Sequence, residues 1–407
     1  MKKISNNIFF LSIFNIKQYL HYIPWITYVI LVLFISLFIV HRTTLTHYNF
    51  NWFDPLTNIL RYILFFLGIT SCFFESKRKF VLCVCYFVIA FVTYTYGNSW
   101  VLFDLFFIPL FLSKNLKIST VIDIFFYLIL FGTIATIAMD LLDYLPKHQH
   151  NFYRFYRESQ VIRYSLGFSH PNSLGMMLML ISMLVVLKVK IMKLWHLIFI
   201  MSLCILCSTV PKSYTSSAVI FCLCMISCIK SVLQKYNIDF KRKNIIFFLT
   251  ISFFTIVIVG SYVIALTDII PKEIVAKIPV SLYSRFSFGE KAFTQFGFSL
   301  FGQEYHPVFI TAIMNGAPPS SFFVVDCLYF YMPIFVGVVP TLIYLFLFYR
   351  AAWLSINKGN YILLFVLIMI SIYSISEYLV IFPLFMFAYF DYGNSFKSTE
   401  QKIPLKH

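Results

Sequence analysis

The stretch Gly167-Phe168-Ser169-His170-Pro171-Asn172 interrupts hydrophobic sequence at the point where an apolar segment begins. A histidine, a proline and an asparagine stand together there, and polar groups at a membrane surface usually mark a functional site. The rest of the chain is apolar: 60% of the 407 residues are hydrophobic, 50 are phenylalanine and only 12% are charged. This composition is too apolar for a soluble protein of this length, and it predicts an all-α polytopic membrane protein.

Apolar segments long enough to cross a membrane recur along the whole chain. Since a helical crossing needs about 20 apolar residues, the sequence predicts about 12 transmembrane helices. We expect them near residues 23–40, 56–74, 80–96, 99–113, 120–139, 173–187, 194–210, 216–233, 245–266, 322–348, 361–378 and 379–391. At the end of this series, Ile381–Pro383 also fits a re-entrant corner in place of two full crossings. No repeat or linker divides the chain, so we expect one integral membrane domain over residues 1–407.

The basic residues predict the orientation, because short loops rich in Lys and Arg stay in the cytoplasm. With the N-terminus inside, 21 of the 32 Lys and Arg residues are cytoplasmic and ten are outside. Both termini are then cytoplasmic, and the two long loops, 140–171 and 267–321, are extracytoplasmic.

Eight of the ten outside charges lie in these two loops, among them Arg154, Arg163 and Arg285, while Lys212 lies in a shorter loop. Two interpretations stay open. The charges can attract anionic lipid headgroups, or they can form a site for a phosphate-bearing substrate, because the arginine fork matches phosphate oxygens. The net charge of +16 does not require a nucleic acid as partner.

Four ionisable residues inside predicted spans fall in the outer third of their helices: Arg61, Asp104, Asp326 and Glu377. Each alone is compatible with a charge that reaches the membrane surface. Together they predict a polar cavity open to the outer leaflet, since ionisable groups at that depth normally face one another or water.

Several absent motifs limit the chemistry. The sequence has no phosphate-binding loop of the Gly-rich, Lys-Ser/Thr type and no Asp-x-Asp pair, so direct use of ATP or of a metal-bound nucleotide sugar is not expected. Cys204 and Cys207 have the spacing of a redox pair, but they lie in an apolar span, where two small apolar residues on one helix are the better interpretation. We expect no disulfide, no metal and no cofactor.

Four elements follow one another between residues 160 and 380. They are YSLGFSHPNSLG at 164–175, Ser284–Gly289 with Phe293–Gln303, Asp326–Tyr329, and Ser376–Tyr378. In order and spacing they resemble the bacterial polysaccharide polymerases of the O-antigen polymerase and ligase superfamily, the Wzy-like enzymes of Gram-positive capsule and exopolysaccharide synthesis.

The chain also departs from this family. Tyr214 stands where an arginine is expected after the seventh span, and Lys212 can supply the charge instead. Asp326 is followed by Cys327 and not by the family's asparagine, which puts a side-chain amide contact to substrate in doubt.

The resemblance implies a GT-C-like glycosyltransferase in the cytoplasmic membrane of a bacterium. Such an enzyme transfers a growing chain from undecaprenyl pyrophosphate to a hydroxyl of a second carrier-linked unit, without ATP or nucleotide sugar. The partners implied are the undecaprenyl-pyrophosphate-linked oligosaccharide, membrane lipid, and flippase and chain-length regulator proteins.

This transfer needs cationic stabilisation of the departing pyrophosphate and a base near the attacking hydroxyl. Arg285 is the first candidate for the cation, and the base is His306, His170 or Asp326. Asp326 and Tyr329 are three residues apart, so they are expected to share a helix face and to orient a sugar hydroxyl together. The substrate-binding residues that we predict are Arg285, Arg163, Arg154, Asn172, Tyr329, Glu377 and Lys212.

A structural alternative exists for the central motif. His170 precedes a proline, which disfavours helix at that residue, and Asn172 can cap the following helix. The start of a helix therefore explains both residues about as well as catalysis does.

Other classes of protein remain as alternatives. A lipid-linked oligosaccharide flippase or secondary transporter typically shows an internal repeat and charges at mid-membrane, whereas here no repeat is visible and the charges gather on one side. A ligase of the same superfamily shares the predicted chemistry. A non-catalytic scaffold does not need the basic outer loops.

Overall fold

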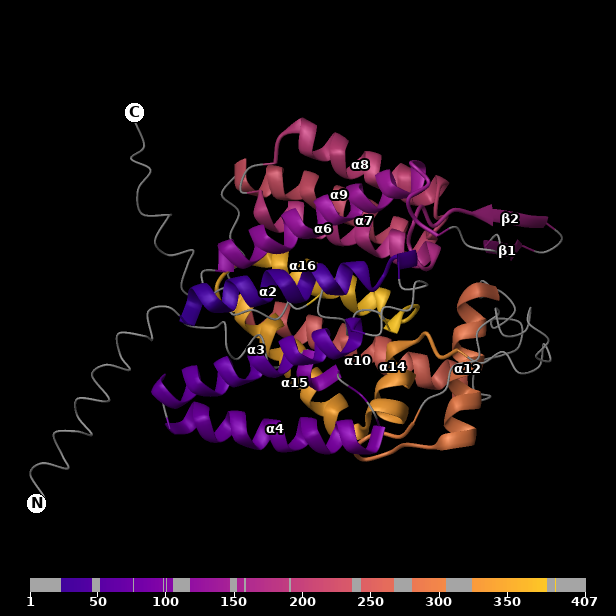
Figure 1. Cartoon of the computed structure of the whole chain (residues 1–407). Helices are drawn as coiled ribbons and strands as arrows, with labels where there is room; N and C mark the ends of the chain where they lie inside the picture. Colours follow the sequence, from indigo (N-terminus) through magenta and orange to yellow (C-terminus); the bar gives the residue numbers. More distant parts are fainter. Residues whose placement is uncertain are drawn as a thin grey trace, which may run out of the picture.

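The computed structural model describes residues 23–45, 52–75, 77–97, 99, 101–104, 118–146, 152–156, 159–189, 192–235, 243–266, 280–304, 324–378 and 385. The described chain is mostly helical, and Figure 1 shows its elements in chain order. The helices are α2 (Ile23–Val40), α3 (Phe53–Glu75), α4 (Lys77–Gly97), α6 (Ile118–Leu141), α7 (Pro171–Lys188), α8 (Leu194–Thr209), α9 (Tyr214–Lys235), α10 (Lys243–Leu266), α12 (Val280–Phe296), α14 (Leu328–Tyr331), the π-helix η3 (Met332–Val336), α15 (Val338–Asn357) and α16 (Tyr361–Tyr373). The strands are β1 (Phe152–Tyr156) and β2 (Ser159–Arg163), which pair as an antiparallel hairpin.

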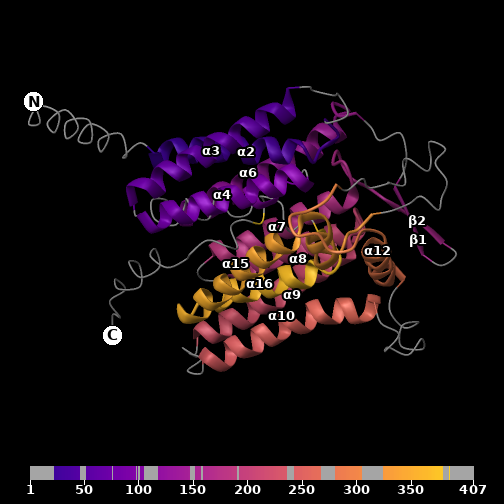
Figure 2. The same ribbon diagram turned by 90° about the horizontal axis from the view of Figure 1, so that it is seen from below.

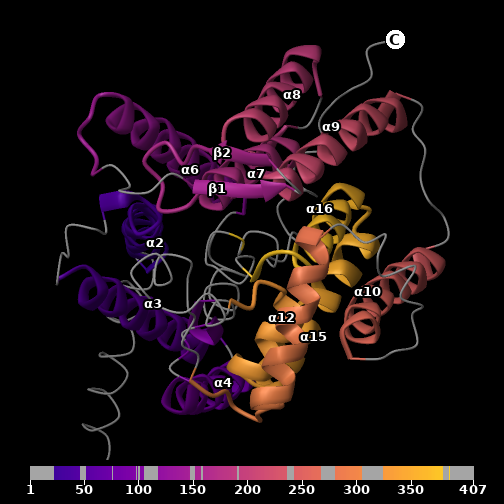
Figure 3. The same ribbon diagram turned by 90° about the vertical axis from the view of Figure 1, so that its right-hand side faces the viewer.

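Neighbouring helices contact one another in a closed ring. From α4 the contacts run through α3, α2 and α6 to α7, and from α7 through α16 and α15 back to α4. Figure 3 shows α2, α3 and α4 on one side of this ring and α9, α10 and α16 on the other. The N-terminal and C-terminal halves of the chain therefore meet along α7 and along α4.

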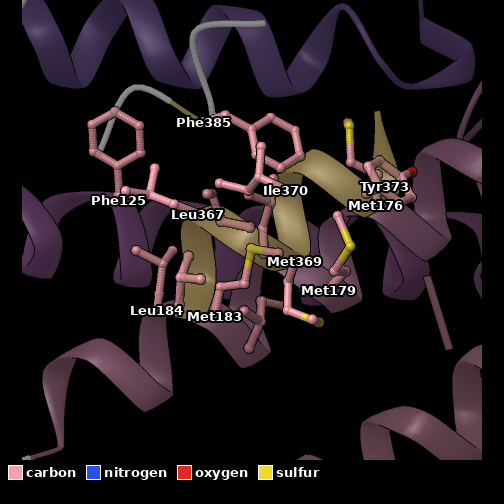
Figure 4. Close-up of a cluster of buried hydrophobic side chains, with 14 of the residues drawn as sticks. Phe125, Met176, Met179, Met183, Leu184, Leu367, Met369, Ile370, Tyr373 and Phe385 are labelled. Atoms are coloured by element: carbon pink, nitrogen blue, oxygen red, sulfur yellow. The ribbon is translucent and has the colours of Figure 1, made fainter. Parts of the chain in front are cut away.

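α7 is the central helix of the bundle. Of the 18 residues of α7, 83% are buried. In the other four long apolar helices among the described residues, at most 39% of the most apolar 18-residue stretch is buried. Met176, Met179 and Met183 of α7 pack against α16 (Figure 4). Methionine is unbranched and fills irregular gaps between helices. The central motif of the sequence therefore leads into the best-packed helix of the protein.

The outer surface of the bundle is apolar. Phe66, Phe131, Phe248 and Leu342 are each more than 60% exposed although they lie within helices. Large exposed apolar surfaces of this kind are unusual in soluble monomers. Five helices are long and apolar enough to cross a membrane by length and composition, and the described residues include shorter apolar helices as well. These findings support the prediction of an all-α membrane protein, while the number of twelve spans stays a prediction.

Most predicted spans coincide with a helix to within a few residues, from α2 to α10. Of the span predicted at 99–113, only Ser99 and 101–104 are described, and of the span at 379–391, only Phe385 is described. The single domain over residues 1–407 stays a prediction.

The span predicted at 322–348 is wrong as one continuous helix. Residues 324–327 have no regular secondary structure, and the short helix α14 and the π-helix η3 follow before α15 begins at Val338. Pro333 lacks a backbone N–H, and Gly337 has a φ of 114°, outside the helical region. Hydropathy cannot detect the break between α14 and α15, because Pro333, Gly337 and the residues between them lie in apolar sequence.

The carbonyls near this break are satisfied by the segment after α12. Ser299 Oγ donates to the Ile334 carbonyl at 2.8 Å, and Gln303 N donates to the Phe335 carbonyl at 3.1 Å. Gln303 Nε2 also donates to the Ile334 carbonyl, at 3.0 Å. Unpaired backbone groups are costly in a membrane protein unless neighbouring groups satisfy them. The Phe293–Gln303 element therefore has a structural role in stabilising the broken helix.

We expect Gly337→Ala to destabilise the protein by about 2 kcal/mol or more. A Cβ at this residue would lie 2.6 Å from Gly302 N and 2.7 Å from the Leu300 carbonyl oxygen, and backbone atoms cannot move aside cheaply. The measurement is the thermal unfolding temperature of the purified protein in detergent. Gly260→Ala in α10 is the matched control, because nothing lies within 4 Å of its added Cβ. An equal unfolding temperature for the two variants would contradict the role of Gly337.

Both predicted outer loops contain regular structure at one end of the bundle. The loop at 140–171 contains the β1–β2 hairpin, and the loop at 267–321 contains α12. Figures 1 and 2 show the hairpin and α12 at the same end of the helices. Four of the basic residues predicted to lie outside, Arg154, Arg163, Arg285 and Lys291, are thus carried by ordered elements at a common end.

Candidate functional site

The segment before α7 is held by backbone contacts with the turn that follows α2. Thr44 N donates to the Gly167 carbonyl and Ser169 N donates to the Arg42 carbonyl, both at 2.8 Å. Gly167 has a φ of 79°, and a Cβ there would lie 2.5 Å from Leu145 Cδ1 and 3.0 Å from the Thr136 carbonyl oxygen. Glycine is therefore required at this residue both by the backbone conformation and by the close packing on α6.

His170 is the N-cap of α7. Its backbone is extended (φ −153°, ψ 146°), its Nδ1 accepts from Asn172 N at 3.1 Å, and Pro171 occupies the first helical position. The backbone of His170 is therefore non-helical, as its place before Pro171 predicts. The prediction that Asn172 caps the helix is wrong, because Asn172 lies inside the first turn. This arrangement leaves the Asn172 side chain available for other contacts, and the His170 residue is exposed.

The Asn172 side chain joins two distant parts of the chain. Its Oδ1 accepts from Arg163 Nη2, and its Nδ2 donates to Glu377 Oε1 at 2.8 Å. Arg163, the last residue of β2, also donates through Nε to the Pro211 carbonyl at 2.8 Å. The loop that carries Pro211 lies close to α7, because a Cβ at Gly175 would meet Ser213 at 2.5 Å.

Arg285 lies between two carboxylates. Its Nη1 is 3.0 Å from Asp326 Oδ2, and its Nη2 is 3.1 Å from Glu377 Oε1. The side chains of Arg285 and Glu377 are 16% and 7% exposed, and that of Asp326 is 32% exposed. Asp326 is therefore the more accessible of the two carboxylates.

Two effects act on the charge of Arg285. Burial alone lowers the pKa of Arg285, but the carboxylates of Glu377 and Asp326 outweigh burial and raise the pKa above its ordinary value. The guanidinium group is therefore charged at every physiological pH.

Arg285 reaches this site because α12 packs closely on α14. A Cβ at Gly289 would lie 2.5 Å from the Phe330 ring, so only glycine permits this approach. Phe286 and Ala292, on the same helix, are buried in a cluster with Phe330. The packing of α12 thus determines the position of the arginine.

Five of the residues predicted from the sequence therefore form one hydrogen-bonded group, which we call the Arg–carboxylate network. It consists of Arg163, Asn172, Arg285, Asp326 and Glu377. Its two guanidinium groups and two carboxylates balance in formal charge. Charge-assisted contacts of this kind are about twice as strong as neutral hydrogen bonds.

Tyr329 and Asp326 do not share a helix face, so that prediction is wrong. Asp326 is in the non-helical segment before α14, whereas Tyr329 is within the helix. The Tyr329 hydroxyl is 2.8 Å from the Ser371 carbonyl oxygen and 2.9 Å from Ser371 Oγ, and the residue is 8% exposed. This geometry gives Tyr329 a packing role between α14 and α16.

Three further residues predicted for the site are Lys212, Arg154 and His306. Lys212 follows Pro211 directly and has a positive φ of 48°. Arg154 lies in β1, opposite Val161 of β2. His306 lies outside the described residues.

The four ionisable residues predicted to share a cavity fall into two ion-paired groups. Asp326 and Glu377 belong to the Arg–carboxylate network, whereas Arg61 pairs with Asp104 through two contacts of 2.8 and 3.1 Å. Arg61 also donates to Asn58 Oδ1 at 2.7 Å. Arg61 and Asp104 thus face each other, whereas Asp326 and Glu377 both face Arg285, and a polar cavity common to all four residues stays a prediction.

Sequence reasoning missed Arg42 as a residue near the site. Burial lowers the pKa of Arg42 to about 10, and Tyr378, next to Glu377 in the chain, acts in the opposite direction. The Tyr378 ring stacks on Tyr331 at a centroid distance of 4.6 Å. An arginine directly after the first apolar span was the signal available in the sequence.

No group of three or more His, Cys, Asp or Glu residues in the described part of the chain could hold a metal ion. Cys204 and Cys207 are both buried in α8, where their thiols contact the start of α9. Comparisons of the chain with protein families, with curated proteins and with solved structures gave no match.

Proposed function

We propose that this chain is a GT-C-type membrane glycosyltransferase that polymerises lipid-linked oligosaccharide repeat units. Its donor is an oligosaccharide on undecaprenyl pyrophosphate, and its product is a capsular, exopolysaccharide or O-antigen-like polymer. It acts on the outer face of a bacterial cytoplasmic membrane, with twelve spans and both termini in the cytoplasm. A flippase and a chain-length regulator are its partners.

The Arg–carboxylate network is the observation that carries this proposal. It combines two arginines with two carboxylates at one end of an apolar helix bundle, and it draws them from β2, α7, α12, the segment before α14 and the segment after α16. A glycosyl transfer with a pyrophosphate leaving group needs both kinds of group, a cation for the phosphate oxygens and a base for the attacking hydroxyl. The apolar outer surface of the helices suits a lipid-linked substrate.

In the proposed reaction, a hydroxyl of the acceptor unit attacks the anomeric carbon of the donor sugar. A glycosidic C–O bond forms, the bond from that carbon to the pyrophosphate oxygen breaks, and the hydroxyl proton passes to the base. Undecaprenyl pyrophosphate leaves with the electron pair of the broken bond. Because the leaving group is already activated, the transfer needs no ATP.

The proposed reaction assigns a role to each predicted residue that takes part in it. Arg285 and Arg163 stabilise the leaving pyrophosphate, since two guanidinium groups can bind phosphate oxygens in a water-poor site. Asp326 is the base that the contacts favour, because its carboxylate is the more exposed of the two. His170 and His306 remain alternatives for the base, and Arg154 and Lys212 contribute positive charge near the substrate.

The test is a reconstituted assay with the purified protein and the lipid-linked repeat unit alone. We expect the protein to lengthen the repeat unit without nucleotide sugar, ATP or divalent metal, and gel electrophoresis of the labelled glycan measures the product. A flippase would move the repeat unit across a liposome membrane without lengthening it. That result, or an absolute requirement for any of the three omitted components, would overturn the proposal.

A further inference from the structure

Asn172 directs both polar atoms of its side chain, and Glu377 one carboxylate oxygen, towards protein groups. Asn172 uses both ends of its amide, Oδ1 towards Arg163 and Nδ2 towards Glu377. Glu377 Oε1 accepts from two donors, Asn172 Nδ2 at 2.8 Å and Arg285 Nη2 at 3.1 Å. With a side-chain exposure of 7%, Glu377 is poorly placed to receive a substrate directly.

We propose that Asn172 and Glu377 are positioning residues, which form a hydrogen-bonded relay that holds the guanidinium groups of Arg163 and Arg285 as one anion-binding pair. The inference rests on the proposed function, and it replaces the expectation that Asn172 and Glu377 contact the substrate themselves. The ligand class is a diphosphate, which has oxygens enough for two arginine forks.

The relay holds two groups of like charge close together. Arg163 comes from the hairpin and Arg285 from α12, so the two cations are carried by elements far apart in the sequence. Like charges repel, and long side chains lose rotamer freedom when they are fixed. A buried carboxylate between the two arginines offsets the repulsion, and fixed partners reduce the entropy lost when a ligand binds.

The order of donors and acceptors along the relay explains why residue 172 is an amide. Arg163 donates to the amide oxygen, the amide nitrogen donates to Glu377, and Arg285 donates to the same carboxylate oxygen. An aspartate at residue 172 would keep an acceptor for Arg163 but would face Glu377 with a second carboxylate. A glutamine at residue 377 removes that conflict, because its own amide nitrogen can donate to the new aspartate.

This logic gives a rescue experiment with Asn172→Asp, Glu377→Gln and the double variant. Calorimetric titration of inorganic pyrophosphate into the detergent-purified protein measures the affinity. We expect each single change to weaken binding by about tenfold or more, the scale of a lost hydrogen bond to a charged group. The double variant should recover affinity to within about threefold of the natural protein, whereas independent effects would multiply.

Controls separate positioning from folding. Asn360→Asp is the matched control, because Asn360 caps α16 by accepting from Leu363 N at 3.2 Å and aspartate caps equally well. Thermal unfolding of each variant shows whether it is folded. If Asn172→Asp does not fold, recovery of folded, pyrophosphate-binding protein in the double variant is the same rescue.

Three results would overturn the relay. They are a double variant that binds no better than Asn172→Asp, a folded Glu377→Gln variant with unchanged affinity, and natural protein that lengthens repeat units but binds no pyrophosphate. Failure of the proposed function is a different result. In that case the natural protein binds pyrophosphate and the rescue succeeds, but no repeat unit is lengthened.

Discussion

Arg285→Ala is expected to abolish polymer while the protein remains in the membrane. The change removes the guanidinium group that contacts both Asp326 and Glu377, and with it the cation proposed for the leaving pyrophosphate. Cationic stabilisation of this kind is worth about 3–4 kcal/mol in the transition state, or about 100-fold or more in rate. The measurements are polymer formed in cells that lack the natural gene copy and lengthening of the repeat unit by purified protein.

Two further variants are compared with Arg285→Ala to interpret this result. Arg285→Lys should restore activity only in part, because lysine keeps the charge but not the planar fork that contacts two carboxylates or two phosphate oxygens. Arg350→Ala, an exposed arginine on α15, is the matched control and should leave polymer unchanged. Normal polymer in a folded Arg285→Ala protein would make Arg285 a structural residue and would remove the main support for the proposed reaction.

The helices of this protein could be predicted from the sequence with good accuracy, because hydropathy measures what a span requires. α2 begins and ends at the residues predicted, and α10 differs by two residues at its start. The sequence does not predict the hairpin of β1 and β2, because its residues indicate only a charged loop. The break between α14 and α15 escaped detection because Pro333 and Gly337 lie within uninterrupted apolar sequence.

The members of the Arg–carboxylate network could also be identified from the sequence, although their partners could not. Arg163, Asn172, Arg285, Asp326 and Glu377 were each visible as polar residues in an apolar context or in a basic outer loop. Their connection depends on tertiary packing, such as the contact of Gly289 with Phe330 that brings α12 over α14. For the same reason the sequence could not show that Tyr329 bonds to Ser371, or that Arg61 and Asp104 form a pair of their own.

The N-cap of α7 shows a second limit of prediction from the sequence. Residue type alone favours Asn172 as the cap, because asparagine is a common N-cap and histidine is not. Pro171 moves the helix start back by two residues, from 173 to 171, since proline is favoured at the first helical position. The cap therefore falls on His170, and Asn172 becomes available to connect Arg163 with Glu377.

Asp104→Leu is expected to destabilise the protein by about 3 kcal/mol or more, because it leaves a buried cation without its carboxylate. The side chains of Arg61 and Asp104 are only 13% and 9% exposed, and two contacts join them. The double variant Arg61→Leu/Asp104→Leu should recover most of this loss, since replacing both partners of a buried pair by apolar residues is often neutral.

Asp123→Leu is the control, because Asp123 pairs with Lys188 at a more exposed site and its loss should cost about 1 kcal/mol or less. Thermal unfolding in detergent measures stability, and lengthening of the repeat unit per folded protein measures activity. A stable double variant that keeps its activity separates this structural pair from the Arg–carboxylate network, whereas a stable double variant without activity would assign Arg61 and Asp104 to the reaction site.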